Sequence, residues 1–339
     1  MGVKDFYRWL EHAGYVPDTE EFVYSSSRLI VDTKSLMYRF GYGVAIDKTT
    51  EEFCNTVAAL IQDFFEQFEH VTFVNDGQID NSHPKFLTSL QRSQQLEQSR
   101  KRAHDMSAQL AQELLENGTN QDEKLERLDK LERAARGVSF EKSKMILKIL
   151  EHAHPNFQCV QCDAEADDYI LLHHNEYDYV ISEDSDFIVG GVNKLLRGIG
   201  TKKQGIYKIQ DILQKLQLTL LQLQEIASIA GNDYTMKGIE NMGLAKAYPL
   251  IQKYGSCQTM LFKWTPKERG RAVVSPLFFE RFNLSMNVYQ KTTDVIYLHE
   301  PIKLHIQDDD DDEKKAKKTP LEQPIQEFYS IFKKQKKIN

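Results

Sequence analysis

The chain has 339 residues, 41% hydrophobic and 27% charged, and its net charge is −7. That hydrophobic content excludes general disorder, and no apolar run reaches the roughly 20 residues that span a bilayer, so we expect no membrane association. The first residues lack the apolar stretch of a secretory signal, and four cysteines in so long a chain fit a reducing compartment. Net charge alone argues against a nucleic-acid partner, but it is a poor guide where acids hold cations.

The first part of the chain alternates between strand and helix patterns. The apolar run Leu29–Val31 predicts a buried strand that ends at Asp32 and is followed by a helix. Apolar residues at helical spacing predict another helix over 51–68. The stretch "HVTFVNDGQ" then predicts a second strand that ends in a turn at Asp76 and Gly77.

The composition changes at Phe86. Up to about Leu150 the chain is rich in Gln, Glu, Lys and Arg with scattered Leu, which predicts a charged helical insertion over 86–150. The segments "FQCVQC", "YDYVISEDSDF" and "GIYKIQDILQKLQLT" predict further strands, the first and last of them followed by helices. We expect helix from about Thr219 to Tyr254, and we assign no element between Ser275 and Asn287.

Strands that alternate with helices predict an α/β fold with a mostly parallel central sheet flanked by helices. The core is expected in two stretches, 1–85 and 151–300, on either side of the insertion. Residues 301–320 contain "QDDDDDEKKAKKTP" and read as a charged linker, and 321–339 form a tail that regains apolar residues.

Acidic residues recur where the predicted strands end. In parallel sheets the functional crevice lies at the carboxyl ends of the strands, and one acid there is usually only a cap or turn residue. The candidates are Asp32, Asp76, Asp163, Glu165, Asp184, Asp186 and Asp233. The apolar flanks "YVI" and "FIV" argue against a solvated charge cluster, and spacing by two in an extended strand would put Asp184 and Asp186 on one face.

Divalent cations would offset the repulsion among these carboxylates. Ligands that are all oxygen select hard ions such as Mg²⁺, with Mn²⁺ as a substitute. Two such ions about 3.5–4 Å apart can stabilise the attacking and leaving oxygens of a phosphoryl displacement. The pattern therefore favours hydrolysis of phosphodiesters. A competing zinc site from His152, His154, Cys159 and Cys162 is conceivable, but "CxxC" alone is a weak signal and a buried strand explains this stretch better.

Several motifs in a fixed order carry a family resemblance over residues 1 to about 260. They are "MGV", "VDTKSLMY", "FVNDG", "CDAEADD", "SEDSDFIVGG" and "IAGNDYTMKGIENMGLAKA". In this order they resemble the flap endonuclease / XPG-type structure-specific 5′ nuclease family. The resemblance implies a PIN-like nuclease core that binds two Mg²⁺ through the seven acids named above. Asp163 departs from the family, which usually has Glu there, and the following Asp167 and Asp168 leave the choice of ligands open.

The resemblance also implies roles for residues outside the acidic set. Lys85 and Arg92 would contact the scissile phosphate as catalytic residues, although His83 stands at the position where the family usually has this Lys. Tyr38 would stack on a base beside that phosphate, and Gly2 would pack near the active site. The alternative for Lys85 and Arg92 is an ordinary solvated pair on a helix.

Two further regions are expected to hold nucleic acid. The insertion resembles the family's helical arch, with Arg100, Lys101 and Arg102 as backbone contacts; the alternative is a solvated helical hairpin. Residues 226–255 resemble its helix-two-turn-helix, which can also hold K⁺ on duplex DNA. There Gly238, Gly243 and Lys246 would approach a phosphate, and the alternative is a plain pair of packed helices.

The tail "EQPIQEFYSIF" is similar to the motif by which family members bind a sliding clamp. Ile325, Phe328 and Tyr329 fit that motif, whereas Glu322 replaces its usual Gln, and a short helix packed on the domain is the alternative. The lysines of 314–318 and 333–337 could form a nuclear localisation signal or could be simple solubilising charge.

The leading expectation is a monomeric, Mg²⁺-dependent 5′-flap endonuclease and 5′→3′ exonuclease. It would act on branched or 5′-ended DNA in replication or repair, in the nucleus or in a host-cell nucleus, with the cytoplasm as the other location. One alternative keeps the chemistry but cuts RNA, because "MGVKDFYRWL" is also similar to the start of 5′→3′ exoribonucleases. Another is an inactive binding scaffold, although such relatives typically lose several of the acids that are all present here.

Overall fold

A single six-stranded sheet organises the core of the computed structural model, which describes residues 2–19, 23–44, 48–79, 83, 85–116, 126, 129–130, 138–235 and 238–290. The strands are β1 Arg28–Asp32, β2 His70–Asn75, β3 Phe157–Gln161, β4 Tyr179–Ile181, β5 Lys194–Arg197 and β6 Gly205–Lys208. Their order is β3-β2-β1-β4-β5-β6; neighbours are parallel except β6, which runs antiparallel to β5. The predicted mostly parallel α/β fold is confirmed, and β5 is a strand that the sequence analysis did not assign.

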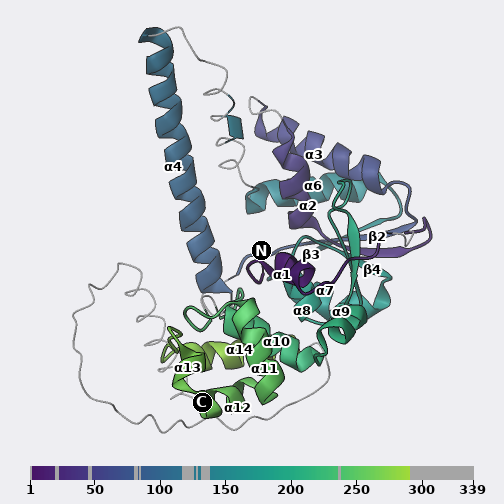
Figure 1. Cartoon of the computed structure of the whole chain (residues 1–339). Helices are drawn as coiled ribbons and strands as arrows, with labels where there is room; N and C mark the ends of the chain where they lie inside the picture. The colour runs from purple at the N-terminus through teal and green to yellow at the C-terminus, as the bar shows by residue number, and fades with distance from the viewer. Residues whose placement is uncertain are drawn as a thin grey trace, which may run out of the picture. The chain divides into compact units, whose positions relative to one another are not determined.

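Helices cover both faces of the sheet, which buries the strands on two sides (Figure 1). On one face Leu29 and Val31 of β1 pack with three helices: α2 Thr33–Tyr42, α3 Thr50–Phe65 and α6 Phe140–Ala153. On the other face Ile30 packs with a cluster formed by the remaining core helices. These include α1 Phe6–His12, α7 Ala166–His173, α8 Asp186–Val189 and α9 Ile209–Leu216, with the short 3-10 helix η1 His174–Glu176 after α7.

The charged insertion contains one long helix, α4 Phe86–Glu116 (Figure 1). Residues 140–150, which the sequence analysis grouped with the insertion, lie in α6 instead. Ile146, Leu147 and Leu150 of α6 are buried in the core against α3. The apolar residues of this stretch therefore serve the sheet and not the insertion.

The C-terminal part of the described chain is a group of five helices. They are α10 Leu220–Ala230, α11 Leu244–Tyr254, α12 Cys257–Lys263, α13 Pro266–Arg269 and α14 Phe278–Gln290. A capping box between Thr219 and Gln222 begins α10, which packs on both α11 and α14. Helix α14 covers most of the stretch that the sequence left unassigned. None of the described helices is both long and apolar enough to cross a bilayer.

Candidate active site

The ends of β1 and β2 place two of the acids at one edge of the sheet. Asp32 is the last residue of β1 and caps α2: its Oδ1 accepts from the backbone N–H of Ser35 at 3.2 Å, and its Oδ2 accepts from the Ser182 hydroxyl at 2.7 Å. Asp76 follows β2, and its Oδ1 accepts from the backbone N–H of Ala166 at 2.8 Å. Both side chains are buried. The parallel pairing of β1 with β2 thus brings these carboxylates to the same edge.

A turn after β4, and not an extended strand, brings Asp184 and Asp186 together. β4 ends at Ile181, and Asp186 already begins helix α8. Within the turn the backbone N–H of Asp186 donates to Asp184 Oδ1 at 3.0 Å. Asp184 and Asp186 do lie together, as expected. The expected cause, alternation along an extended strand, is wrong, because the strand ends before either residue.

The pair Asp163 and Glu165 does not enter the site as a pair. β3 ends at Gln161, and the following loop leaves Asp163 exposed. Glu165 is the N-cap residue of α7 and is half-buried, whereas Asp167, in the first turn of α7, is buried. The structure therefore gathers Asp167 with the other acids in place of Asp163, and Asp168 stays exposed.

Asp233 reaches the same place from the loop between α10 and α11. It is buried, and its carboxylate accepts from Arg92 NH2 at 2.6 and 2.7 Å. Its backbone carbonyl accepts from the Thr88 hydroxyl. Because Thr88 and Arg92 are one turn apart on α4, the base of α4 is fastened directly to the loop of Asp233.

Burial and mutual repulsion raise the pKa values of several of these acids. Burial raises the pKa of Asp32 to about 8, helped by the charges of Asp167 and Asp76. Burial, followed by the charges of Asp167 and Asp233, raises the pKa of Asp184 to about 6. The pKa of Asp186 lies well above its usual value, again because of burial first and then the Asp184 charge. An added cation here would therefore stabilise the ionised carboxylates.

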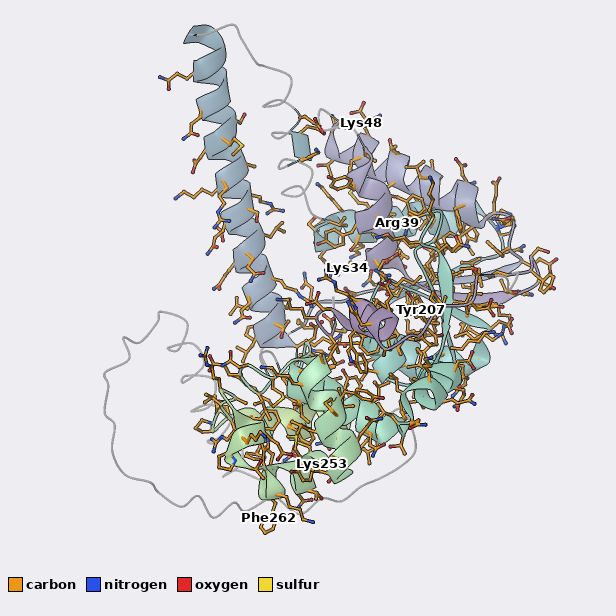
Figure 2. The ribbon with its side chains drawn as sticks, in the orientation of Figure 1. Lys34, Arg39, Lys48, Tyr207, Lys253 and Phe262 are labelled. Atoms are coloured by element: carbon orange, nitrogen blue, oxygen red, sulfur yellow. The ribbon has the colours of Figure 1, made fainter. Side chains whose placement is uncertain are left out.

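Cationic side chains of the protein already lie among the carboxylates. Lys85 is buried, its Nζ pairs with Asp167, and it lies 3.7 Å from Glu165 Oε2. Burial opposes the charged form of Lys85, but these carboxylates outweigh it and hold its pKa well above the usual value. Lys34, which Figure 2 labels on α2, pairs with Asp76 at 2.7 Å. Lys85, Lys34 and Arg92 thus each neutralise one side of the cluster.

The donor set fits a hard divalent cation, although it is not a finished coordination sphere. All the gathered ligands are carboxylate oxygens, and Asp186 Oδ2 is a buried atom that makes no hydrogen bond. Within the described part of the chain, no three His, Cys, Asp or Glu side chains already stand in a metal-binding arrangement. The residues that would hold a cation are therefore Asp32, Asp76, Glu165, Asp184, Asp186 and Asp233, with Asp167 beside them.

A cleft of about 660 Å³ opens beside the acids between the base of α4, α2 and the start of α6. Glu165, Lys85 and Arg92 line it, and Tyr38 of α2 projects into it with 40% of its surface exposed. Arg100 lines the cleft one helical segment further along α4. Lys101 and Arg102 are exposed but are not part of this lining, because successive helical residues point about 100° apart.

Gly2 lies against the acidic turn. Its backbone has φ +75°, and a Cβ there would lie 2.2 Å from Asp184 Oδ1 and 2.5 Å from Ser185 Oγ. The next residue, Val3, donates its backbone N–H to Ser185 Oγ at 2.9 Å. Glycine is thus required by both the backbone conformation and the lack of space.

The loop between α10 and α11 contains two glycines, of which one is required by the structure and the other is not. Gly238 has φ +59°, and a Cβ there would collide with the carbonyl of Ile229, so the turn requires glycine. Gly243 is the N-cap residue of α11 with φ −93° and has open space around its Cβ position, so the protein itself does not require glycine there. Lys246 lies in the first turn of α11, and its Nζ donates to the carbonyl of Asn241.

The sequence left open whether Asp167 or Asp168 is a ligand, and the structure places Asp167 with the other acids. Lys34 was not assigned to the site from the sequence, and its ion pair with Asp76 appears only in the structure. The alternative zinc site is not seen: His152 bonds to the carbonyl of Lys148 in its own helix, the His154 ring lies tilted against Phe157, and no metal-binding group of three is found among the described residues. The tail residues Ile325, Phe328 and Tyr329 and the linker 301–320 lie outside the described residues.

Comparison with known proteins places this geometry in context. Residues 156–233 match the XPG I-region, which includes the loops of Glu165, Asp184 and Asp186 and ends at Asp233. Flap endonuclease 1-2 of Paramecium tetraurelia is 37% identical over 102 residues, which cover 30% of this chain. Flap endonuclease 1 of Enterocytozoon bieneusi is 24% identical over 254 residues, which cover 73% of this chain and 68% of the relative.

The fold is also similar to that of a solved protein. The catalytic core of Rad2 in complex with a DNA substrate superposes with a TM-score of 0.58 at 18% identity, covering 85% of this chain and 86% of that one. The chain is similar to flap endonucleases and to XPG-type nucleases. Its match spans about a quarter (26%) of the length of the Paramecium relative, so this similarity concerns only a part of that protein. The resemblance drawn from the ordered motifs is confirmed, and so is the PIN-like core that it implied.

Proposed function

We propose that this protein is a divalent-metal-dependent, structure-specific 5′ nuclease that hydrolyses phosphodiester bonds in branched or 5′-ended DNA. The observation that carries the proposal is the group of buried carboxylates at one sheet edge, which Lys85, just before α4, and Arg92, in the first turns of α4, both contact. Mg²⁺, two ions per chain, is the cofactor that this oxygen-only donor set fits best, and Mn²⁺ is a substitute.

The residues of the chain divide the work by charge and position. Asp32, Asp184 and Asp186 are buried, so they would hold cations away from bulk solvent and with little freedom to rearrange. Bound there, divalent ions would supply an activated water and would neutralise the charge that develops on the phosphate. Tyr38 would stack on a base, because its ring is exposed in the cleft next to Lys85 and Arg92.

Lys85 and Arg92 are the candidates for contact with the scissile phosphate. Both now pair with carboxylates, so each would have to exchange a carboxylate partner for a phosphate oxygen. Arg92 is better suited to this exchange, because 42% of its side chain is exposed whereas Lys85 is buried beneath it. Lys85 would then act mainly by holding Glu165 and Asp167 together.

The decisive experiment compares cleavage of a labelled 5′-flap DNA by the wild type and by Asp184→Ala, each with Mg²⁺ and with chelator. We expect the wild type to cut the flap only with the metal. Asp184→Ala should still bind the DNA but should lose cleavage, because a buried ligand is gone. Equal cleavage by both proteins would contradict the assignment of Asp184.

The same assay separates the alternatives. Cleavage of single-stranded RNA in preference to the flap would assign the protein to the RNA-cutting alternative. Binding without any cleavage would indicate an inactive scaffold, which the full set of acidic positions disfavours. K⁺ at the loop of Gly238, a sliding clamp bound by the tail, a monomeric state and action in the nucleus remain proposals that rest on the family resemblance.

A further inference from the structure

Behind the acids lies a buried polar network that joins helix α14 to the site. Ser285 and Tyr289 of α14 are both fully buried and are one helical turn apart. The Ser285 hydroxyl is 2.8 Å from the hydroxyl of Ser228 on α10 and accepts from Asn232 Nδ2 at 2.8 Å. The Tyr289 hydroxyl accepts from the same Nδ2 at 3.0 Å. Buried polar groups of this number are unusual unless they fix a specific arrangement.

The orientation of the Asn232 amide follows from its other partners. Its Oδ1 accepts from the backbone N–H groups of Tyr234 and Thr235 at 3.0 and 2.8 Å, and from the Thr235 hydroxyl at 3.0 Å. Only Nδ2 can therefore face α14, and it uses its two hydrogens on Ser285 and Tyr289. The residue next to Asn232 is Asp233, so this amide also fixes the loop that carries a candidate ligand.

The hydroxyl of Tyr289 has one hydrogen left to give. Because it already accepts from Asn232, its own hydrogen is directed to Asp186 Oδ1, which lies 3.4 Å away. The ring of Tyr289 is held in an edge contact with Tyr234 at 5.7 Å between ring centroids. Asp186 Oδ1 thus accepts a hydrogen bond from Tyr289, whereas Asp186 Oδ2 makes no hydrogen bond.

We propose that Tyr289 is a positioning residue for Asp186, and that α14 is thereby part of the divalent-cation site although no residue of α14 would touch the ion. The proposal rests on the proposed function. Hydrogen bonds to a ligating carboxylate from its far side set the carboxylate's direction and its strength as a ligand. Tyr289 and Asn232 would therefore hold Asp186 and Asp233, which come from different parts of the chain, in one fixed relation.

The test replaces the hydroxyl and keeps the ring, in Tyr289→Phe. Tyr248→Phe is the matched control, because its hydroxyl makes a part-buried hydrogen bond at 2.9 Å to the carbonyl of Leu216 in α9, which is not a residue of the acidic cluster. Calcium binding to the DNA-free proteins is measured by calorimetry, and kcat and KM for the flap are measured with Mg²⁺. We expect about tenfold weaker Ca²⁺ binding and a lower kcat at unchanged KM in Tyr289→Phe, and wild-type values in the control.

Thermal unfolding shows whether each variant is folded at the assay temperature. If Tyr289→Phe does not fold, Ser285→Ala tests the network one step further away, because it removes one of the two acceptors of the Asn232 amide whose other acceptor is Tyr289. A folded Ser285→Ala protein should then also bind Ca²⁺ more weakly than the wild type, and unchanged affinity there would count against the proposal. Calcium affinity equal to the wild type in a folded Tyr289→Phe protein would overturn the proposal. Absence of Ca²⁺ binding and of cleavage in the wild type itself would instead contradict the proposed function.

Discussion

At Gly2 the backbone adopts φ +75°, and the nearest atom to a Cβ there would be Asp184 Oδ1. Gly14 has nearly the same backbone, φ +78°, but a Cβ there would meet only the flexible end of Lys215 at 3.3 Å. Both positions have a left-handed backbone, which strains any residue other than glycine. Only Gly2 borders the acidic cluster, so only there would a Cβ displace a carboxylate.

We expect Gly14→Ala to lose about 1–2 kcal/mol of unfolding free energy, because alanine is strained at positive φ, and Gly2→Ala to lose at least as much, because its Cβ would also collide with Asp184. Only Gly2→Ala should also lose activity, by about 100-fold, because displacement of Asp184 by even an ångström misplaces a ligand. Urea unfolding and flap cleavage measure the two effects. Comparable activity in both variants would show that the space around Asp184 is not critical.

The sequence predicted single acids well where a strand determines them. Asp32 and Asp76 follow apolar runs, and parallel pairing carries the ends of β1 and β2 to one edge. The choice between Asp163 and Asp167 could not be made in this way, because it depends on where the loop after β3 turns into α7. The same holds for Tyr289, whose partner Asp186 is 103 residues away along the chain.

At the scale of elements, α4 is a helix whose base joins the site and whose next turns line the cleft. Arg100 lies on the cleft side, whereas Lys101 is exposed without contributing to that lining. The sequence presented "RKR" as one basic cluster, because composition alone does not show which face of a helix turns toward a neighbouring element.

We expect Arg100→Ala to weaken binding of flap DNA and to reduce the slope of log K against log salt by about one, because one phosphate contact is lost. Lys101→Ala should leave the slope within error of the wild type. Fluorescence anisotropy at several salt concentrations, with Ca²⁺ to prevent cleavage, measures both. Equal slopes for the two variants would indicate that the cleft does not track the DNA backbone.

A second element-scale effect concerns the contact of α10 with α12. Glu225 of α10 is buried, and its carboxylate accepts from the backbone N–H of Cys257 at the start of α12. Burial raises the pKa of Glu225 to about 7, against the opposing hydrogen bond from Cys257. The folded protein therefore holds this proton more tightly than the unfolded chain, in which the pKa is near 4.5.

The stabilising contribution of protonated Glu225 is complete below about pH 4.5 and is lost as the pH rises through 7. We expect Glu225→Gln, which keeps an oxygen for Cys257 but cannot ionise, to gain stability relative to the wild type between pH 5 and pH 8, by up to about 3 kcal/mol. Denaturant unfolding across this range gives the difference. A difference between variant and wild type that does not change with pH would contradict the raised pKa.

At the scale of the molecule, the site is assembled from widely separated parts of one chain. β1, β2 and the turn after β4 supply Asp32, Asp76 and Asp184, while the loop after α10 supplies Asp233 and α4 supplies Arg92. Ordered motifs in the sequence were sufficient to predict the resemblance to flap endonucleases, and the alternation of strands with helices predicted the α/β core. The contribution of α14 could not be predicted, because no element was assigned between Ser275 and Asn287 and the partners of its buried hydroxyls lie far away along the chain.

The pairing of Arg92 with Asp233 has a thermodynamic consequence for the whole molecule. The guanidinium cannot neutralise Asp233 and a phosphate of the substrate with the same hydrogens, so a cation that replaces it at Asp233 leaves it available for the phosphate. Binding of a cation at Asp233 thus favours binding of a substrate phosphate at Arg92, and the reverse also holds. Such coupling is reciprocal: each ligand must change the affinity of the other by the same factor.

We therefore expect Ca²⁺ to tighten flap binding, and the flap to tighten Ca²⁺ binding, by one common factor within the usual range of about 5- to 150-fold. In Arg92→Gln the DNA-free protein should bind Ca²⁺ more tightly than the wild type, because no guanidinium competes for Asp233, and the common factor should fall toward one. Calorimetry measures Ca²⁺ binding with and without the flap, and fluorescence anisotropy measures flap binding with and without Ca²⁺. Arg92 would then be an exchangeable counter-ion of Asp233, and each ligand would bind most tightly when the other is also bound.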